Sequence, residues 1–277
     1  MITVWSKKPK SKHRPVTHKR ALALHEGLRR AGVESELRFA SAWDGRPVPS
    51  VASGWPLLWR TCRDADVPFW VVDNAVLGDR KQYADWETTP IRLSFGRPSP
   101  RYRESDLDGS RLSKLNVEIS KWRPRKGGHV LVCPPAGSLA SCYHKIDQEK
   151  WLSQVREALP VKLRKRVLVR RKGSPGPLRS ALANSMVVVS HSSRVGFDAL
   201  AFGVPVVETE GTIRDWNGLS PGQIGREDLM KANRTSLFQF VSWTQFLLSE
   251  IRSGMAWEAS LRLQEDAPKE EVLRGET

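Results

Sequence analysis

The sequence predicts an α/β protein made of two halves, and three observations carry that prediction. Short apolar runs typical of strands alternate with amphipathic helical segments along most of the 277 residues. Hydrophobic residues make up 39% of the composition, which is enough for a sizeable buried core. The segment Pro124–Gly128 has the composition of a linker and divides the chain near its middle. Alternation of this kind favours parallel sheets with helical crossovers.

The first half, residues 1–126, begins with an apolar run at Ile2–Ser6 that we expect to form a strand. Helical spacing follows over Arg20–Ala31, where Gly32 is placed to end the helix. Residues 76–111 are rich in Gly, Pro, Arg and Tyr, so we expect loops and short irregular strands there. Between these regions the pattern predicts a strand, a helix and a second strand, at Glu36–Ala40, Leu57–Cys62 and Pro68–Val72.

The second half shows clearer alternation. Its continuous apolar runs are typical of strands covered on both faces and lie at His129–Cys133, Arg166–Val169, Met186–Val189 and Val204–Val207. Helices are predicted between these strands, at Asp147–Leu159, Pro177–Ala183 and Arg194–Phe202. A long amphipathic helix is predicted over Phe238–Arg252. We therefore expect domains at 1–126 and 127–237, a C-terminal helical segment at 238–257 and a flexible tail at 258–277.

Several classes of protein are excluded by simple features. The three cysteines, Cys62, Cys133 and Cys142, form neither a disulfide framework nor a metal-ligand spacing. No apolar run approaches the roughly 20 residues that span a bilayer. The start of the chain, Met1–Ser6, lacks the charged-then-apolar order of a signal peptide. We therefore expect a cytoplasmic protein with reduced cysteines, and the sequence says nothing of its oligomeric state.

Positive charge is concentrated in the first half. The net charge is +15, and residues 1–126 carry 25 Lys or Arg against 14 Asp or Glu, which is +11 of that total. Such an excess favours a polyanion or an anionic membrane surface as partner, although a basic run can also be an ordinary solvated loop. The densest run has no acidic residue, and its candidate nucleic-acid-binding side chains are Lys7, Lys8, Lys10, Lys12, Arg14, Lys19 and Arg20.

Polar residues follow three of the strands expected in the second half. In parallel α/β sheets, ligands bind beyond the carboxyl ends of the strands, and a helix that starts there offers backbone N–H groups to anions. The serine cluster after the third strand precedes such a helix directly, and basic residues follow the second strand. The alternative is that the serines only cap the helix and the basic side chains are surface charge. The candidate donor-binding residues are Gly137, Ser138, Arg170, Lys172, Ser190, His191, Ser192, Ser193 and Gly196.

The segment Ser190–Val207, with the sequence Ser-His-Ser-Ser-Arg-Val-Gly-Phe-Asp-Ala-Leu-Ala-Phe-Gly-Val-Pro-Val-Val, resembles the donor-side motif of GT-B glycosyltransferases. Capsular-polysaccharide transferases carry a similar stretch. The order of motifs over about residues 115–257 also resembles a group of phage-encoded glycosyltransferase-like proteins. Residues 1–114 resemble them poorly. Members of the family usually have Glu where this chain has Asp198, which is one methylene shorter.

The resemblance implies a GT-B-like fold, with two Rossmann-like domains facing across a cleft. The nucleotide-sugar, a UDP-sugar as first candidate, would bind the second domain as a co-substrate, and the last helix would cross back to the first. GT-B enzymes usually need no metal, so we expect no metal site and no tightly bound cofactor. Asp64-Ala-Asp66 has the spacing of a metal motif, but it lies at a helix end, where metal binding is the less favoured interpretation.

An inverting transfer needs a base for the acceptor hydroxyl. Asp73, at the end of a strand, is the candidate base, although it could equally be an ordinary turn residue. Asp44 and Asp79 are further candidates for the base. The first hypothesis for the acceptor is a hydroxymethylated pyrimidine in phage DNA, which places the enzyme in the host cytoplasm. The base would have to be flipped out, and Trp43, Trp86 or Trp122 could stack on it. The alternatives are a polysaccharide or lipid-linked acceptor at a membrane surface, and a non-catalytic nucleic-acid-binding protein.

Overall fold

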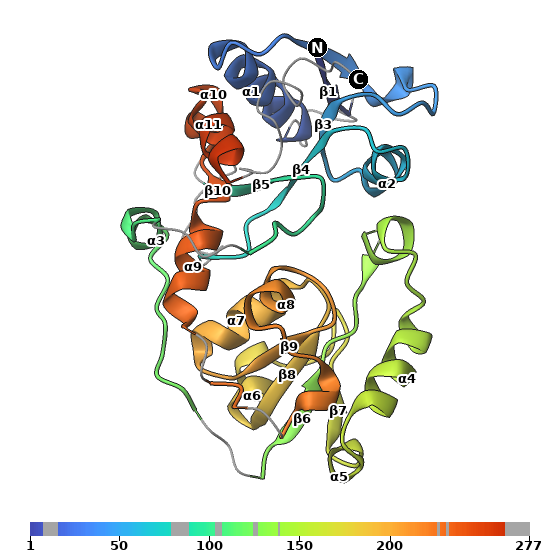
Figure 1. Ribbon diagram of the computed structural model, residues 1–277, viewed down its shortest axis with the longest axis vertical. Helices are drawn as coiled ribbons and strands as arrows, with labels where there is room; N and C mark the ends of the chain where they lie inside the picture. Colours follow the sequence, from blue (N-terminus) through green and yellow to red (C-terminus); the bar gives the residue numbers. More distant parts are fainter. Residues whose placement is uncertain are drawn as a thin grey trace. The chain divides into compact units, whose positions relative to one another are not determined.

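The computed structural model describes residues 1–7, 16–78, 89–102, 107–123, 127–137, 139–225, 228–230 and 233–263. The chain forms two compact units (Figure 1). Unit 1 comprises Met1–Ala75, Asp79–Pro100 and Trp243–Thr277, and unit 2 comprises Val76–Gly78 and Arg101–Ser242. The main division therefore falls near residue 100, whereas the linker composition predicted it near residue 126, and the C-terminal segment belongs to unit 1.

Unit 1 is built on a mixed sheet of six strands in the order β10-β5-β4-β3-β1-β2. The strands β1 to β4 run parallel, while β5 and β10 are antiparallel to their neighbours. Three of these strands, β3, β5 and β10, were not predicted as defined strands. The strands are β1 (Ile2–Ser6), β2 (Ser35–Phe39), β3 (Ser50–Ser53), β4 (Phe69–Asn74), β5 (Ile91–Phe95) and β10 (Gln245–Phe246).

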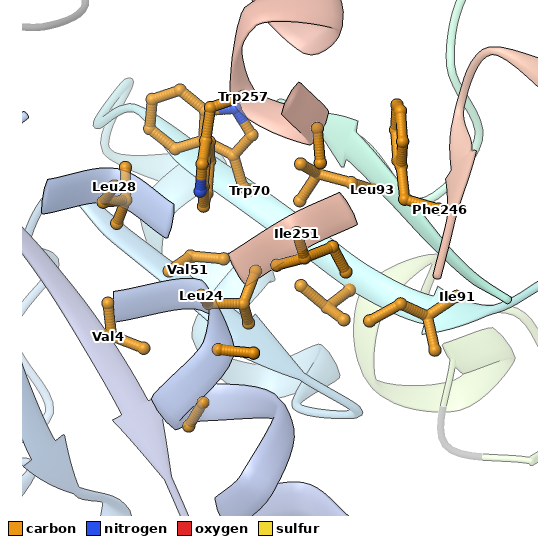
Figure 2. Packing of buried hydrophobic residues seen from close by; sticks show 14 of the residues in the cluster. Val4, Leu24, Leu28, Val51, Trp70, Ile91, Leu93, Phe246, Ile251 and Trp257 are labelled. Carbon is orange, nitrogen blue, oxygen red and sulfur yellow. The ribbon is translucent and has the colours of Figure 1, made fainter. Parts of the chain in front are cut away.

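Helices cover both faces of the unit 1 sheet. Leu24 and Leu28 of α1 (Val16–Arg30) pack with Ile251 of α10 (Leu248–Arg252) and Trp257 of α11 (Met255–Arg262) over the sheet residue Trp70 (Figure 2). The helix α2 (Pro56–Asp64) buries Leu58 and Trp59 and packs against β4. A short 3-10 turn, η1, spans Ala40–Ala42.

The contact between α1 and α10 is close enough to require a glycine. A Cβ atom built on Gly27 would lie 1.9 Å from the carbonyl oxygen of Ile251. Gly32, with φ of +77°, ends α1 as its position in the sequence predicted. The C-terminal segment therefore completes the core of unit 1, far along the chain from the strands that it covers.

Unit 2 contains a parallel four-stranded sheet in the order β7-β6-β8-β9. The strands are β6 (His129–Val132), β7 (Val167–Val169), β8 (Ser185–Ser190) and β9 (Val206–Glu208). The longer helices are α4 (Gln148–Ala158), α7 (Arg194–Phe202) and α9 (Arg234–Ser242). The shorter helical elements are α3 (Ser110–Lys114), η3 (Leu139–Tyr143), α5 (Val161–Arg164), α6 (Leu178–Ala183), α8 (Thr212–Asn217) and η4 (Pro221–Gln223).

Helices cover both faces of the unit 2 sheet. Val130 and Val187 pack in one cluster with Trp151 and Val155 of α4. Successive residues point to opposite faces of a strand, so Leu131 faces the other side, where α6 and α7 pack against β8. These two units, each with a largely parallel sheet between helices, confirm the α/β class and the two Rossmann-like domains expected from the sequence.

The prediction of a single helix over residues 238–252 was wrong. The chain leaves α9 at Ser242, adds β10 to the edge of the unit 1 sheet and starts α10 only at Leu248. The Leu93 N–H donates to the Thr244 carbonyl, so sheet pairing outweighs the local helical pattern. Part of the predicted flexible tail is also helical, because α11 continues to Arg262. Within the described ranges, none of the helices has the length and apolar character needed to cross a membrane.

Candidate functional site

The carboxyl ends of the four unit 2 strands bring several predicted donor-binding residues to one edge of the sheet. Ser190 ends β8, His191 follows it, and Arg170 follows β7 two strands away. Between them, Cys133 follows β6, and β9 ends at Glu208 on the far side of β8. The parallel register therefore gathers residues that are distant in sequence, as the strand-end argument requires.

A buried carboxylate, Glu208, occupies the start of α7. Its Oε1 accepts hydrogen bonds from the Ser193 N–H (2.9 Å) and the Ser190 hydroxyl (3.1 Å). The Ser193 side chain caps α7 by accepting the Val195 N–H, and the Ser192 N–H donates to the Glu210 carbonyl. The amides of Ser192, Ser193 and Val195 are thus bonded within the protein. The phosphate cradle that we predicted from backbone N–H groups here is filled by Glu208, because a carboxylate suits the positive end of a helix as a phosphate does.

Two glycines allow this packing. A Cβ on Gly196 would lie 2.7 Å from Ile213 and 3.1 Å from Glu208 Oε1. Gly211 has a φ of +115°, and its Cβ would meet Ser192 at 2.9 Å. The space beside Gly196, a predicted donor-binding residue, is therefore occupied by protein side chains.

The basic residues after β7 have different environments. Arg170 donates to the carbonyls of Ser174, Pro175 and Gly176 and so holds its own loop. Its neighbour Arg171 pairs with Glu149 at 2.7 Å. Lys172 is exposed to solvent. Of the two predicted basic donor ligands, Lys172 faces solvent, while the guanidinium of Arg170 is bonded to the carbonyls of its own loop.

The end of β6 contributes less than expected. Gly137 has a φ of +76° and open space around it, and Ser138 lies outside the described residues. Cys133 is buried at the strand end, and burial raises the pKa of its thiol to about 11, with a smaller opposing effect from Arg170. The thiol is therefore protonated at neutral pH and unsuited to act as a nucleophile.

His191 is the centre of a polar cluster at the same edge. Its Nδ1 lies 2.8 Å from the Thr209 hydroxyl, which also accepts a hydrogen bond from Trp151 Nε1. Its ring meets that of His144 edge-to-face, with centroids 4.7 Å apart. Burial and the neighbouring His144 lower the pKa of His191 to about 4, against an opposing effect of Glu210. His191 is therefore neutral at neutral pH, which suits a hydrogen-bonding or metal-ligating role.

The predicted base, Asp73, ends β4 in unit 1. Its Oδ2 lies 3.6 Å from a guanidinium nitrogen of Arg92, and its Oδ1 accepts the Asn74 N–H at 2.7 Å. About a third of the side chain is exposed, so a substrate proton can reach it.

The other carboxylates considered in unit 1 are in local contacts. Asp44 pairs with Arg46 on the surface, and Asp79 lies outside the described residues. Asp64, of the Asp-x-Asp spacing, ends α2 in an ion pair with Arg63. In unit 2, Asp198 pairs with Arg194 one turn away on α7.

Only part of the basic run can be placed. Lys7 extends toward the Gly54 carbonyl, and Lys19 and Arg20 lie within α1 rather than in a loop. Trp86 lies outside the described residues, as do the remaining members of that run, Lys8, Lys10, Lys12 and Arg14. Trp122 is covered by the guanidinium of Arg234, 3.7 Å from the ring centroid. Trp43 packs edge-to-face on Trp55 and is half-buried.

Sequence reasoning missed Glu208, Glu210 and His144. Glu208 directly follows an apolar run and Glu210 comes two residues later, which is the same strand-end signal that identified Ser190. His144 gave no such signal, because it follows a π-helical turn, η3, that brings it to the sheet from a separate segment.

No known family model matches the chain, and no curated protein matches it. Among solved structures, the chain is similar to the beta Kdo 2,7 transferase of Thermosulfurimonas dismutans KpsC, at 12% identity with a TM-score of 0.42, covering 93% of this chain and 99% of that chain. It is also similar to the beta Kdo 2,4 transferase of the same protein, at 13% identity and a TM-score of 0.42, with coverages of 87% and 89%. Similarities this low carry no argument about the activity of this chain.

Proposed function

We propose that the protein is a glycosyltransferase that binds a nucleotide-sugar at the carboxyl edge of the unit 2 sheet. One observation carries the proposal. The segment Ser190–Val207, which resembles a glycosyltransferase donor motif, folds as a strand end, a serine-capped helix and the next strand. Its polar residues Ser190 and His191 thereby lie at the edge where parallel sheets bind ligands.

The donor diphosphate is assigned to side chains rather than to the amides of α7. Glu208 already accepts the Ser193 amide, so an anion placed on those groups would have to displace a buried carboxylate. The exposed Lys172 follows the edge strand β7, on the far side of β6 from β8, and supplies a cation, while Arg170 orders the loop that carries it. A lysine placed on the departing diphosphate would stabilise the charge that develops as the glycosidic bond breaks.

Asp73 remains the proposed base for the acceptor hydroxyl, and DNA containing a hydroxymethylated pyrimidine remains the proposed acceptor. The charge of +11 on residues 1–126 supports a polyanionic acceptor. A polysaccharide or lipid-linked acceptor at a membrane surface is the second candidate, because an anionic surface satisfies the same charge. A non-catalytic nucleic-acid-binding role is the third.

The proposal is tested first by a panel of nucleotide-sugars. A donor that binds only the folded chain must raise the melting temperature, and we expect at least one, a UDP-sugar first, to do so. The variant Lys172→Ala should weaken that binding about tenfold. Lys162→Ala is the matched control, because Lys162 is an exposed lysine in α5, which precedes β7, and it should bind as the wild type does.

Labelled donors should then be incubated with hydroxymethylated duplex DNA, plain duplex DNA, anionic polysaccharide and liposomes. Transfer to the hydroxymethylated duplex alone is the expected result. Transfer to polysaccharide or lipid would replace DNA as the acceptor and keep the donor site. Absence of any donor binding, together with salt-dependent DNA binding, would reject the enzyme and leave the nucleic-acid-binding role.

A further inference from the structure

Three side chains with metal-ligating atoms meet beside the carboxyl edge of the unit 2 sheet. His191 directly follows β8, Glu210 follows β9, and His144 comes from the segment just after η3. One ligating atom from each lies within 4.8 Å of the other two. Three different segments of the chain therefore converge on one point, where they could supply three protein ligands to a metal ion.

The distances approach those of a tetrahedral site. Glu210 Oε2 lies 3.4 Å from His144 Nδ1 and 3.7 Å from His191 Nε2. Zinc binds imidazole nitrogen and carboxylate oxygen at about 2.0–2.2 Å, which places neighbouring tetrahedral ligands about 3.3 Å apart. The two histidine nitrogens lie as much as 4.8 Å apart, so the imidazoles would have to move about 1.5 Å closer together to bind one tetrahedral ion.

The burial of the two imidazoles points the same way. Both histidine side chains are only 6% exposed, and His191 Nε2, the nitrogen that faces Glu210, has no hydrogen-bond partner among the described residues. Buried polar nitrogens are normally satisfied, so this nitrogen needs an explanation. An ion bound by His191 Nε2 would supply the missing partner.

We propose that His144, His191 and Glu210 bind a divalent transition metal ion of the zinc class. Two imidazoles and one carboxylate are a donor set that zinc favours, and three protein ligands leave a fourth position for water or a substrate oxygen. Glu210 is 48% exposed, so that position has access to solvent. The Thr209 hydroxyl on His191 Nδ1 would orient the ring so that Nε2 faces the ion.

Metal binding is separable from the proposed sugar transfer, because it is measured without donor or acceptor. The untagged full chain, treated with a chelator and then dialysed, is titrated with ZnCl2 by calorimetry. We expect one Zn²⁺ per chain, and Co²⁺ substituted for it should show the intense visible absorption of a tetrahedral site. His144→Ala and Glu210→Ala should each weaken binding at least about tenfold.

Two controls separate this site from other metal-binding groups. His129→Ala removes a histidine from the same unit at the start of β6, and Cys142→Ser removes the half-buried thiol near η3; both should bind Zn²⁺ as the wild type does. Circular dichroism establishes that each variant is folded, and Glu210→Ala changes a half-exposed side chain if His144→Ala fails that check. No uptake by the wild type, uptake that Glu210→Ala leaves unchanged, or uptake lost in Cys142→Ser would overturn the proposal.

Discussion

Both units pack helices on a largely parallel sheet, but they differ at the ends of their strands. In unit 1, the charged pair near the strand ends is Asp73 with Arg92, and the core above the sheet is rich in aromatic side chains such as Trp70 and Trp257. In unit 2, the strands are mostly valine, yet the carboxyl edge buries both His191 and Glu208. Burying polar groups costs free energy unless they are bonded, so the unbonded Nε2 of His191 lowers the stability of unit 2 at the place where a ligand would bind.

The largest expected effect tests the tight packing of unit 1. Gly27→Ala should lower the free energy of unfolding by about 4 kcal/mol, because the new Cβ would meet the backbone carbonyl of Ile251 at 1.9 Å and no side chain can turn aside. Urea unfolding followed by circular dichroism measures the change. Gly109→Ala is the control in unit 2, where the Cβ would meet only the end of the Gln239 side chain at 3.4 Å. Equal stability of the two variants would contradict the packing of α1 on α10.

The second prediction concerns the buried imidazole of unit 2 under metal-free conditions. His191 has a pKa of about 4 in the folded protein, against about 6.5 when unfolded, so unfolding takes up a proton between these values. Its contribution, roughly 3 kcal/mol, is present above pH 6.5 and is lost as the pH falls toward 4. Unfolding in chelator-containing buffers across this range measures the loss.

The variant His191→Gln isolates this contribution. As the pH falls, the free energy of unfolding of this variant should decrease less steeply than that of the wild type, by up to about 1.4 kcal/mol per pH unit. Burial also lowers the pKa of His129, which is present in both proteins and cancels in the comparison. Parallel pH profiles for the wild type and the variant would mean that His191 is not desolvated as the structure indicates.

The third prediction compares two carboxylates, one in each unit. Glu208→Gln should cost about 2 kcal/mol, because one buried oxygen accepts two hydrogen bonds and the amide cannot reproduce the charge. Glu36→Gln, in unit 1, should cost less than about 1 kcal/mol, since that carboxylate is partly exposed and pairs with Arg38 on the surface. Thermal unfolding of both variants and of the wild type tests which substitution costs more stability. A larger loss from Glu36→Gln would reverse the contrast between the units.

How far the sequence predicts the structure also differs between the units. In unit 2 the four strands and α7 were predicted within about two residues, because continuous apolar runs and a serine cap are local signals. In unit 1, β3 has serine at both ends and β5 lies in a segment without periodicity, so neither gave such a signal. The break between α9 and α10 depends on pairing with β5, a contact between residues about 150 positions apart that no window of sequence contains.

The candidate site shows the same limit. Ser190, His191 and Ser193 were found because a strand end and a helix start coincide in the sequence. That Glu208 accepts the Ser193 amide depends on the pairing of β8 with β9, which the alternation of elements suggests but does not specify. The position of His144 depends on the path of η3, for which the residues give no rule.

The smallest expected effect compares two helix caps within unit 2. Ser193 caps α7 at 3.3 Å and Asp147 caps α4 at 2.8 Å, each by accepting a backbone N–H. Asp147→Ala should cost about 1 kcal/mol, the usual price of a lost cap. Ser193→Ala should cost only about 0.5 kcal/mol, because the Glu208 carboxylate remains at the start of α7 and keeps its charge near the helix dipole. Equilibrium unfolding of the two variants measures the difference, and a greater loss from Ser193→Ala would show that the serine, not the carboxylate, stabilises this end of the helix.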